Sequence, residues 1–454
     1  MGAGLTKQGI EMASAAEQLA ANLSFSALAN SEELKKRIWF TLGALIVYRL
    51  GTYIPIPGIN SIALEQFATQ NSTGILGWVN GLAGGALGRM AIFALNIMPY
   101  ISASIIMQLM TTVSPTLEAL KKEGESGRKK INQYTRYGTV FLAAIQAYGI
   151  GIGLQGQGGI VTNPGPFFLA STVITLTGGT LFLMWLGEQI TSRGIGNGIS
   201  LIIFAGIVAG LPSGVAALLE LGRTGQMSVF TILGILLLAF AVIAFIVLFE
   251  RAQRRLLIQY PKRQVGMKMS QAESSHMPLK LNTAGVIPPI FASSLLLLPI
   301  TVANFSAGQG PDWLNSLTAM LGHGQPLFLL FYAALIVFFC FFYTSIQFNP
   351  KETAENLKKS NGFILGIRPG DKTAEYIDWI LTRITVIGAA YLVVVCLLPE
   401  LLVGYSGIPF YFGGTSLLIV VSVTLDTVAQ LQGHMLAQQY GKLLQKASLR
   451  SGKK

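Results

Sequence analysis

Residues 229–255 read VFTILGILLLAFAVIAFIVLFERAQRR, and this stretch decides the class of fold. Its first part, Val229–Phe249, contains no charged residue. A helix needs ~20 mostly apolar residues to cross ~30 Å of hydrocarbon, so this part is long enough to span a membrane. Arg251, Arg254 and Arg255 follow directly. Because basic residues collect on the cytoplasmic side of a membrane, the stretch predicts a transmembrane helix that ends in the cytoplasm.

The composition of the whole chain agrees with a membrane protein. Of its 454 residues, 52% are hydrophobic and 11% are charged, and the mean hydropathy is +0.56. Soluble domains carry about 25% charged residues. The net charge of +12 would indicate nucleic-acid binding in a soluble protein, but here it first indicates basic loops on one side of a membrane. Met1–Ser31 lacks the apolar segment of a secretory signal.

The sequence carries no signature of a catalyst. Cys340 and Cys396 lie inside apolar runs, so a disulfide framework is not expected. The three histidines are far apart, and no group of His, Cys, Asp or Glu has metal-ligand spacing. Phosphate-binding loops, nucleophile elbows and dinucleotide fingerprints are absent. We therefore expect no catalytic residue, no metal and no cofactor.

The apolar runs predict an all-α polytopic membrane protein of about ten transmembrane helices. Sheets are not expected, because the runs are long and lack the alternation of a barrel strand. The expected spans are Ile38–Ile56, Ala91–Val113, Tyr137–Leu154, Phe167–Ile190, Ile199–Pro212, Val229–Phe249, Ala284–Ala303, Leu327–Phe348, Trp379–Leu398 and Pro409–Ala429. The fifth is short and follows a glycine-rich turn, so its bounds are the least defined.

Charge sets the orientation of these spans. Lysine and arginine gather before the first span, after every even-numbered span and in the tail, whereas the intervening loops hold only Arg89 and Arg223. The alternation predicts that both termini are cytoplasmic. Ten spans divide into two fives, and five is odd, so the second half must enter from the opposite face as an inverted unit. The expected divisions are 1–37, a cytosolic segment; 38–213 and 214–430, the two halves; and 431–454, a cytosolic tail. The second half includes large cytosolic loops at 250–283 and 349–378.

Two features allow a functional and a plain interpretation. The segment 75–90 between the first two spans is glycine-rich, too apolar for an aqueous loop and too short to span. It is either a small re-entrant plug or a loop packed on the outer face. Ile97 with Ile101, and Ile199 with Ile203, lie four residues apart and share helix faces. They either seal a pore by excluding water or face lipid and core.

Polar residues also leave alternatives open. Ser102, Gln146 and Asn282 either make interhelical hydrogen bonds or line a gap between helices. A secondary transporter of similar helix count would need ionisable groups near the midplane, which the spans lack. A membrane-embedded enzyme would need a catalytic constellation that is also missing. The basic loops attract anionic lipid, but Gly366–Gly370 reads GIRPG, a turn that would present Arg368 for docking of a partner.

Several strings resemble one known family. They are 97–106 (IMPYISASII), 122–128 (KEGESGR), 187–191 (GEQIT), 193–200 (RGIGNGIS), 349–354 (NPKETA), 366–370 (GIRPG) and 409–416 (PFYFGGTS). In this order they resemble the SecY family, the central pore-forming subunits of the bacterial Sec protein translocon. The resemblance runs from Lys35 to about Tyr440. It implies two five-helix halves around a central hourglass pore that passes unfolded polypeptides across the inner membrane and releases transmembrane segments sideways into it.

The resemblance also implies roles for individual residues. The implied pore ring is Ile97, Ile101, Ile199, Ile203, Ile290 and Ile419. The implied plug contains Asn80, Gly81, Gly84, Gly85 and Gly88. The implied lateral gate lies between the second and third spans and the seventh and eighth, with Ser102, Gln146 and Asn282. The implied docking residues are Arg254, Arg255 and Arg368.

The same resemblance implies the partners and the location. The expected partners are the SecE and SecG subunits, the SecA motor ATPase, the ribosome, the translocating polypeptide and membrane lipids, with YidC and accessory Sec subunits beyond them. The expected location is the bacterial inner membrane, and the energy for transport is expected to come from the partners. Residues 2–26 form an Ala-rich extension outside the resemblance.

Overall fold

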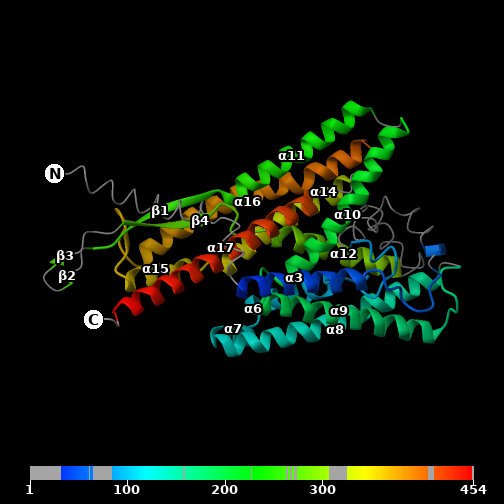
Figure 1. Ribbon diagram of the computed structural model, residues 1–454, viewed down its shortest axis with the longest axis horizontal. Coiled ribbons are helices and arrows are strands. Elements are labelled where there is room, and N and C mark those ends of the chain that lie inside the picture. The colour runs from blue at the N-terminus through cyan, green and yellow to red at the C-terminus, as the bar shows by residue number, and fades with distance from the viewer. Residues whose placement is uncertain are drawn as a thin grey trace.

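A computed structural model describes residues 32–60, 62–64, 84–156, 159–225, 228–261, 264–265, 268–269, 274–305, 325–406 and 414–451. The long helices run side by side along the length of the molecule (Figure 1). They are α3 (Glu32–Gly51), α6 (Met98–Val113), α8 (Glu125–Gln155), α9 (Pro166–Arg193), α10 (Gly198–Arg223), α11 (Val229–Arg251), α12 (Ile287–Phe305), α14 (Pro326–Gln347), α16 (Asp371–Ser406) and α17 (Gly414–Ser451). Two short helices, α7 (Pro115–Lys122) and α15 (Pro350–Lys359), lie between long ones in the sequence.

The helical membrane architecture is confirmed. Within the described residues, seven helices are long and apolar enough to cross a membrane: α8, α9, α10, α11, α14, α16 and α17. The other three long helices, α3, α6 and α12, fall on the remaining expected spans, so the described helices agree with about ten crossings. Proline occupies the first turn of α6, α7, α9, α14 and α15, where its missing N–H costs nothing.

The helices form two groups in sequence order. In the first group α3, α9 and α10 pack together, and α8 packs against α6 and α9. In the second group α14 packs against α12 and α16, while α17 packs against α11 and α16. The groups touch along two seams, one between α12 and the pair α6 and α8, the other between α10 and α17.

For two of the helices whose bounds differ from the expected spans, the local backbone accounts for the difference. The second expected span began at Ala91, but α6 begins at Met98, because residues 91–97 form turns in which Asn96 has a φ of +51°. The fifth ended at Pro212, but α10 continues to Arg223 with Pro212 inside it. Lipid and neighbouring helices favour a continued helix, so one lost backbone hydrogen bond did not end it.

The expectation that sheets are absent holds for the long helices but is wrong for the two loops that were expected to be cytosolic. β1 (Gln253–Gln259) pairs antiparallel with β4 (Ser274–Lys280) and with β5 (Phe363–Ile364), and β2 (Gln264–Val265) pairs with β3 (Lys268–Met269). These strands extend from one end of the helices, at the left of Figure 1. β1 alternates its buried side chains, Leu256 and Ile258, with exposed ones. That period of two was a readable strand signal within a loop.

Two of the hydrophobic clusters among the described residues join these parts. The larger one lies between the helix groups and draws its buried side chains from both. A smaller one joins the sheet to α15 and the start of α16, and includes Leu256, Leu357 and Ile377. The loops around Arg254 and Arg368 are therefore parts of one packed unit.

Candidate functional site

A small cavity lies where the two helix groups meet. It measures about 20 Å³, and a cavity of about 10–15 Å³ is needed for a single water molecule. Its lining is mostly branched and apolar: Asn96, Ile97, Met98, Ile101, Ile203, Ile290, Ser293, Thr415 and Ile419. Five of the six isoleucines named from the sequence therefore surround one cavity. They come from the start of α6 and from α10, α12 and α17.

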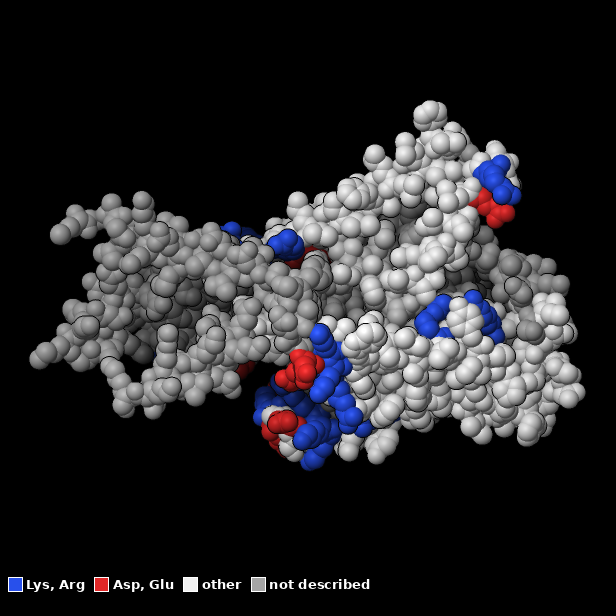
Figure 2. Space-filling model, viewed as in Figure 1, with Lys and Arg blue, Asp and Glu red and all other residues white. Residues whose placement is uncertain are grey.

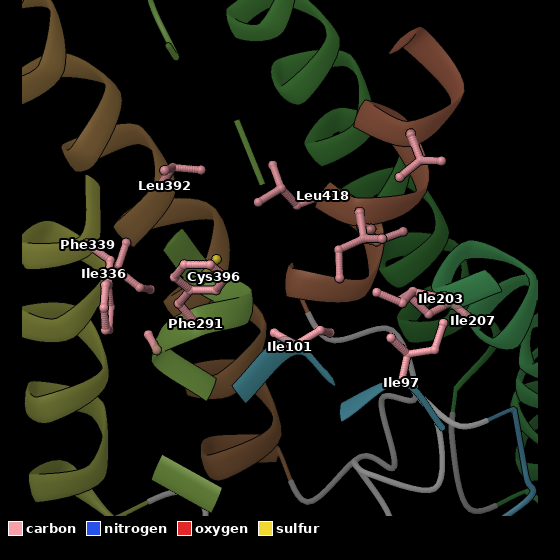
Figure 3. Close-up of a cluster of buried hydrophobic side chains, with 14 of the residues drawn as sticks. Ile97, Ile101, Ile203, Ile207, Phe291, Ile336, Phe339, Leu392, Cys396 and Leu418 are labelled. Carbon is pink, nitrogen blue, oxygen red and sulfur yellow. The ribbon is translucent and has the colours of Figure 1, made fainter. Parts of the chain in front are cut away.

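Four of these isoleucines are buried within the protein. The exposed fraction is 1% for Ile97, 6% for Ile101, 8% for Ile203 and 2% for Ile419. Ile97 and Ile203 point toward one another from α6 and α10 (Figure 3). Such burial excludes contact of these side chains with lipid. Ile290 is half-buried against the same core.

The sixth isoleucine of the predicted ring lies beside the cavity. Ile199 precedes Ile203 by about one helical turn and packs against the same core, but it does not line the cavity. Its side chain lies close to Gly187 of α9, where an added Cβ would be 3.2 Å from Ile199 Cγ1. In this conformation Ile199 therefore faces the junction of α9 and α10.

Local backbone geometry sets the ring positions. Ile97 is the N-cap residue of α6, directly after the turn at Asn96. The side chain of Asn197 caps α10 by accepting a hydrogen bond from the N–H of Ile199 at 3.2 Å. At the start of α17, Thr415 is hydrogen bonded to Tyr332 of α14 at 3.0 Å. The beginning of α10 is thus held by capping and that of α17 by a cross-helix contact, while a turn sets the beginning of α6.

The three predicted gate residues lie on different elements and make different contacts. Ser102 of α6 is buried, and α12 packs against α6 and α8 as the gate prediction requires. Gln146 of α8 is half-buried. Asn282 is buried, and its Nδ2 donates to Glu250 Oε1 of α11 at 2.7 Å and to the carbonyl of Gly285 at 3.1 Å. Asn282 therefore ties the loop before α12 to α11.

The predicted plug is described only in part. Asn80 and Gly81 lie outside the described residues. Gly84 and Gly85 have φ of +64° and +83°, a region that favours glycine. Gly88 is half-buried in the turns that follow, and Ala86 is fully buried. The end of this segment is thus packed on the protein, which is compatible with either interpretation of it.

The predicted docking residues share one small sheet unit. Arg254 and Arg255 are exposed on β1, and Arg368 is exposed in the turn between β5 and α16. The pairing of Ile258 with Ile364 joins β1, which carries Arg254 and Arg255, to β5, which precedes the turn that carries Arg368. The Oγ1 of Thr373 donates to the carbonyl of Arg368 at 2.9 Å, which fixes the turn. Sequence reasoning found the three arginines but not the sheet that groups them.

Charged residues cluster over α7 and the start of α8 (Figure 2). Lys122 pairs with Glu118 at 2.7 Å, and this ammonium holds the pKa of the Glu118 carboxyl below its usual range. Near the start of α16, a hydrogen bond from Lys372 to Glu375 raises the pKa of the lysine. Arg136 binds Glu188 through both carboxylate oxygens, at 2.8 and 2.7 Å, and joins α8 to α9. Glu118 and Lys372 are therefore each stabilised in the charged form by a neighbour of opposite charge.

Comparisons with known proteins agree with this geometry. The family model described as SecY matches residues 91–428. The protein translocase subunit SecY of Escherichia coli strain K12 is 55% identical over 422 residues, covering 92% of this chain and 95% of the relative.

Solved structures share the fold at low sequence identity. A protein-conducting channel has a TM-score of 0.63 at 17% identity, and Sec61 in a canine ribosome–channel complex has 0.62 at 18%. A SecY protein whose plug domain is described as stabilising the closed translocation channel has 0.57 at 18%. Each match covers 88% of this chain and 92% of the other. The match of the family model over most of the chain, and the 55% identity to a SecY subunit, mean that this chain belongs to the SecY family.

Proposed function

We propose that this chain is a protein-conducting channel, through which unfolded polypeptides cross a membrane and transmembrane segments leave sideways into lipid. The observation that carries the proposal is the isoleucine-lined cavity between the two helix groups. Apolar branched side chains offer no charge and no hydrogen bond to hold a passing chain. A narrow apolar constriction also disfavours water and hydrated ions. Both properties suit a channel that must pass any sequence without leaking.

The resting channel is closed by its own side chains in this proposal. A cavity of about 20 Å³ has room for about one water molecule, which supports a constriction at the isoleucines that excludes a continuous water column. The segment at about 75–90 adds a second seal as a plug. This role is supported by the burial of Ala86 and by the related SecY protein whose plug domain is described as maintaining a membrane seal.

The lateral exit lies along the seam between α12 and the pair α6 and α8 in this proposal. Opening would separate α12 and α14 from α6 and α8. Ser102 and Gln146 would then meet the passing segment. Asn282 holds the base of α12 to α11, so it acts in the gate as an anchor of the moving helix.

Partners supply the energy and bind at the sheet unit. Arg254, Arg255 and Arg368 present exposed positive charge there, which suits an acidic protein surface or ribosomal RNA phosphates. One related channel is described in a complex with the ribosome. The proposed assembly includes SecE, SecG, the SecA motor and the ribosome in a bacterial inner membrane, with both termini cytoplasmic. The chain itself provides a path and no catalytic site.

Substitution of the isoleucines tests the proposal. Replacing Ile97, Ile203 and Ile419 together by serine should raise the resting ion conductance of the protein in planar bilayers. The rise should be larger when residues 75–83 are also deleted. Ile174, which is 72% exposed on α9, is the matched control, and Ile174→Ser should leave the conductance unchanged. Equal conductance of the triple variant, the control and the wild type would refute the pore assignment.

A further inference from the structure

The segment from Gly84 to Ile92 is fastened to the end of α3 and to the residues that follow α3 in the chain. The N–H of Ile56 donates to the carbonyl of Met90 at 2.9 Å, and the N–H of Ile92 donates to the carbonyl of Ile54 at 2.9 Å. A further bond from the N–H of Ala91 to the carbonyl of Ala86, also 2.9 Å, closes the segment on itself. The later part of this segment therefore has a fixed backbone position relative to α3.

The earlier part of the segment is held by one side chain. Arg49, in the last turn of α3, donates from Nη1 to the carbonyl of Gly84 at 2.9 Å. Gly84 also lies against α10, where an added Cβ would be 3.0 Å from the Cα of Gly206. Gly84 is thus enclosed between a guanidinium and a helix backbone. Its φ of +64° and this close approach both favour glycine.

A tyrosine holds the guanidinium in place. Arg49 Nη2 donates to the hydroxyl of Tyr53 at 3.2 Å, and the Arg49 guanidinium lies 5.2 Å from the centre of the Tyr53 ring. Arg89, at the far end of the segment, lies 4.3 Å from the same ring. Figure 2 shows a basic patch near the end of α3, apart from the charges over α7. Tyr53 therefore connects both ends of the segment to α3.

Arg49, Tyr53 and Arg89 together form a clasp on the segment. Among the described residues, neither arginine of this clasp pairs with a carboxylate. Arg49 donates hydrogen bonds to a backbone carbonyl and to a phenol hydroxyl, and both guanidinium groups lie against the Tyr53 ring. Tyr53 is 56% exposed, so water can replace these contacts one by one. A clasp of this kind holds the segment in one position and still permits its release.

We propose that Arg49 is a positioning residue, which with Tyr53 and Arg89 sets the resting position of the segment Gly84–Met90 against α3 and α10. This inference rests on the proposed function, because the segment is the end of the proposed plug. Loss of the Arg49 side chain frees the carbonyl of Gly84 and one face of Tyr53, so the segment moves away from α10. Release of this clasp is then an early step of channel opening.

Thiol labelling measures the position of the segment directly. Ala86 is fully buried, so a cysteine at Ala86→Cys should react slowly with a membrane-impermeant maleimide added from the outside. In the Arg49→Ala background its labelling rate should rise at least tenfold. Arg49→Lys should give an intermediate rate, because an ammonium can donate to Gly84 but cannot also bind Tyr53 in the same geometry. Tyr53→Leu provides a second variant of the clasp.

The matched control is Arg223→Ala, which removes another outer arginine, exposed at the end of α10. It should leave the labelling rate at the wild-type value. A wild-type rate in folded Arg49→Ala and Tyr53→Leu proteins, or the same rise in Arg223→Ala, would overturn the assignment. Planar-bilayer conductance of the same variants separates the two proposals. Faster labelling with unchanged conductance supports the positioning role and counts against the sealing role of the plug.

Discussion

The pair Glu250–Asn282 gives the most quantitative prediction. Asn282 is 4% exposed, and it makes three hydrogen bonds: two from Nδ2, and one accepted by Oδ1 from the N–H of Gly285 at 3.1 Å. Asn282→Ala removes all three and leaves the half-buried Glu250 carboxyl without this donor. A lost hydrogen bond to a charged group costs about 1.5–3 kcal/mol and each of the two neutral ones about 1 kcal/mol, so the variant should lose about 3.5–5 kcal/mol of stability.

Thermal unfolding of the purified protein in detergent checks this value. Asn282→Ala should lower the midpoint well below that of Thr283→Ala, whose hydroxyl makes an exposed bond to the carbonyl of Lys280. Glu250→Gln keeps an acceptor oxygen and should stay close to wild type. The double variant Glu250→Leu with Asn282→Ala should recover part of the loss, because removing both side chains leaves no half-buried carboxyl without its donor.

The outcome decides between two roles of Asn282. If Asn282→Ala and Thr283→Ala unfold at the same temperature, the bond to Glu250 does not stabilise the fold and the reasoning is wrong. If the loss appears as predicted, Asn282 anchors the base of α12 to α11. A weaker anchor should then ease the separation of α12 from α6 and α8.

Three further predictions follow from single positions. Gly198→Ala places a Cβ against the backbone of α9 and should destabilise the fold by about 2–3 kcal/mol. In the control Gly210→Ala the new Cβ meets no atom within 4 Å and should not destabilise the fold. Equal thermal unfolding midpoints of the two variants would contradict this prediction. A cysteine at exposed Thr224 should react with an impermeant thiol reagent from outside and one at exposed Ser360 should not, and the reverse pattern would refute the topology. Arg368→Glu should impair motor-driven secretion while the protein folds and inserts normally, since an exposed charge contributes little to stability; normal secretion would exclude docking there.

Much of the architecture was accessible from the sequence. Long apolar runs such as Val229–Phe249 leave no alternative to a membrane helix, because an unpaired backbone cannot lie in lipid. The isoleucines at positions 97, 101, 203, 290 and 419 were named from strings that resemble a family, and the structure brings them around one cavity. Helical spacing alone did not separate them from isoleucines that face lipid, such as Ile174.

The tertiary structure decided the contacts that residue spacing along the sequence cannot predict. The sheet β4–β1–β5 pairs residues about 100 positions apart, and β5 is two residues long, so it carries no pattern of its own. The start of α6 at Met98 depends on turns packed between α3 and α9. Asn282 was expected at a gate, but its partner is the Glu250 side chain of α11. The sequence by itself predicted which segments enter the membrane and on which side their ends lie, because hydropathy and charge act on each segment separately. Only the folded chain determined which polar side chains meet, because each such contact depends on the position of two segments at once.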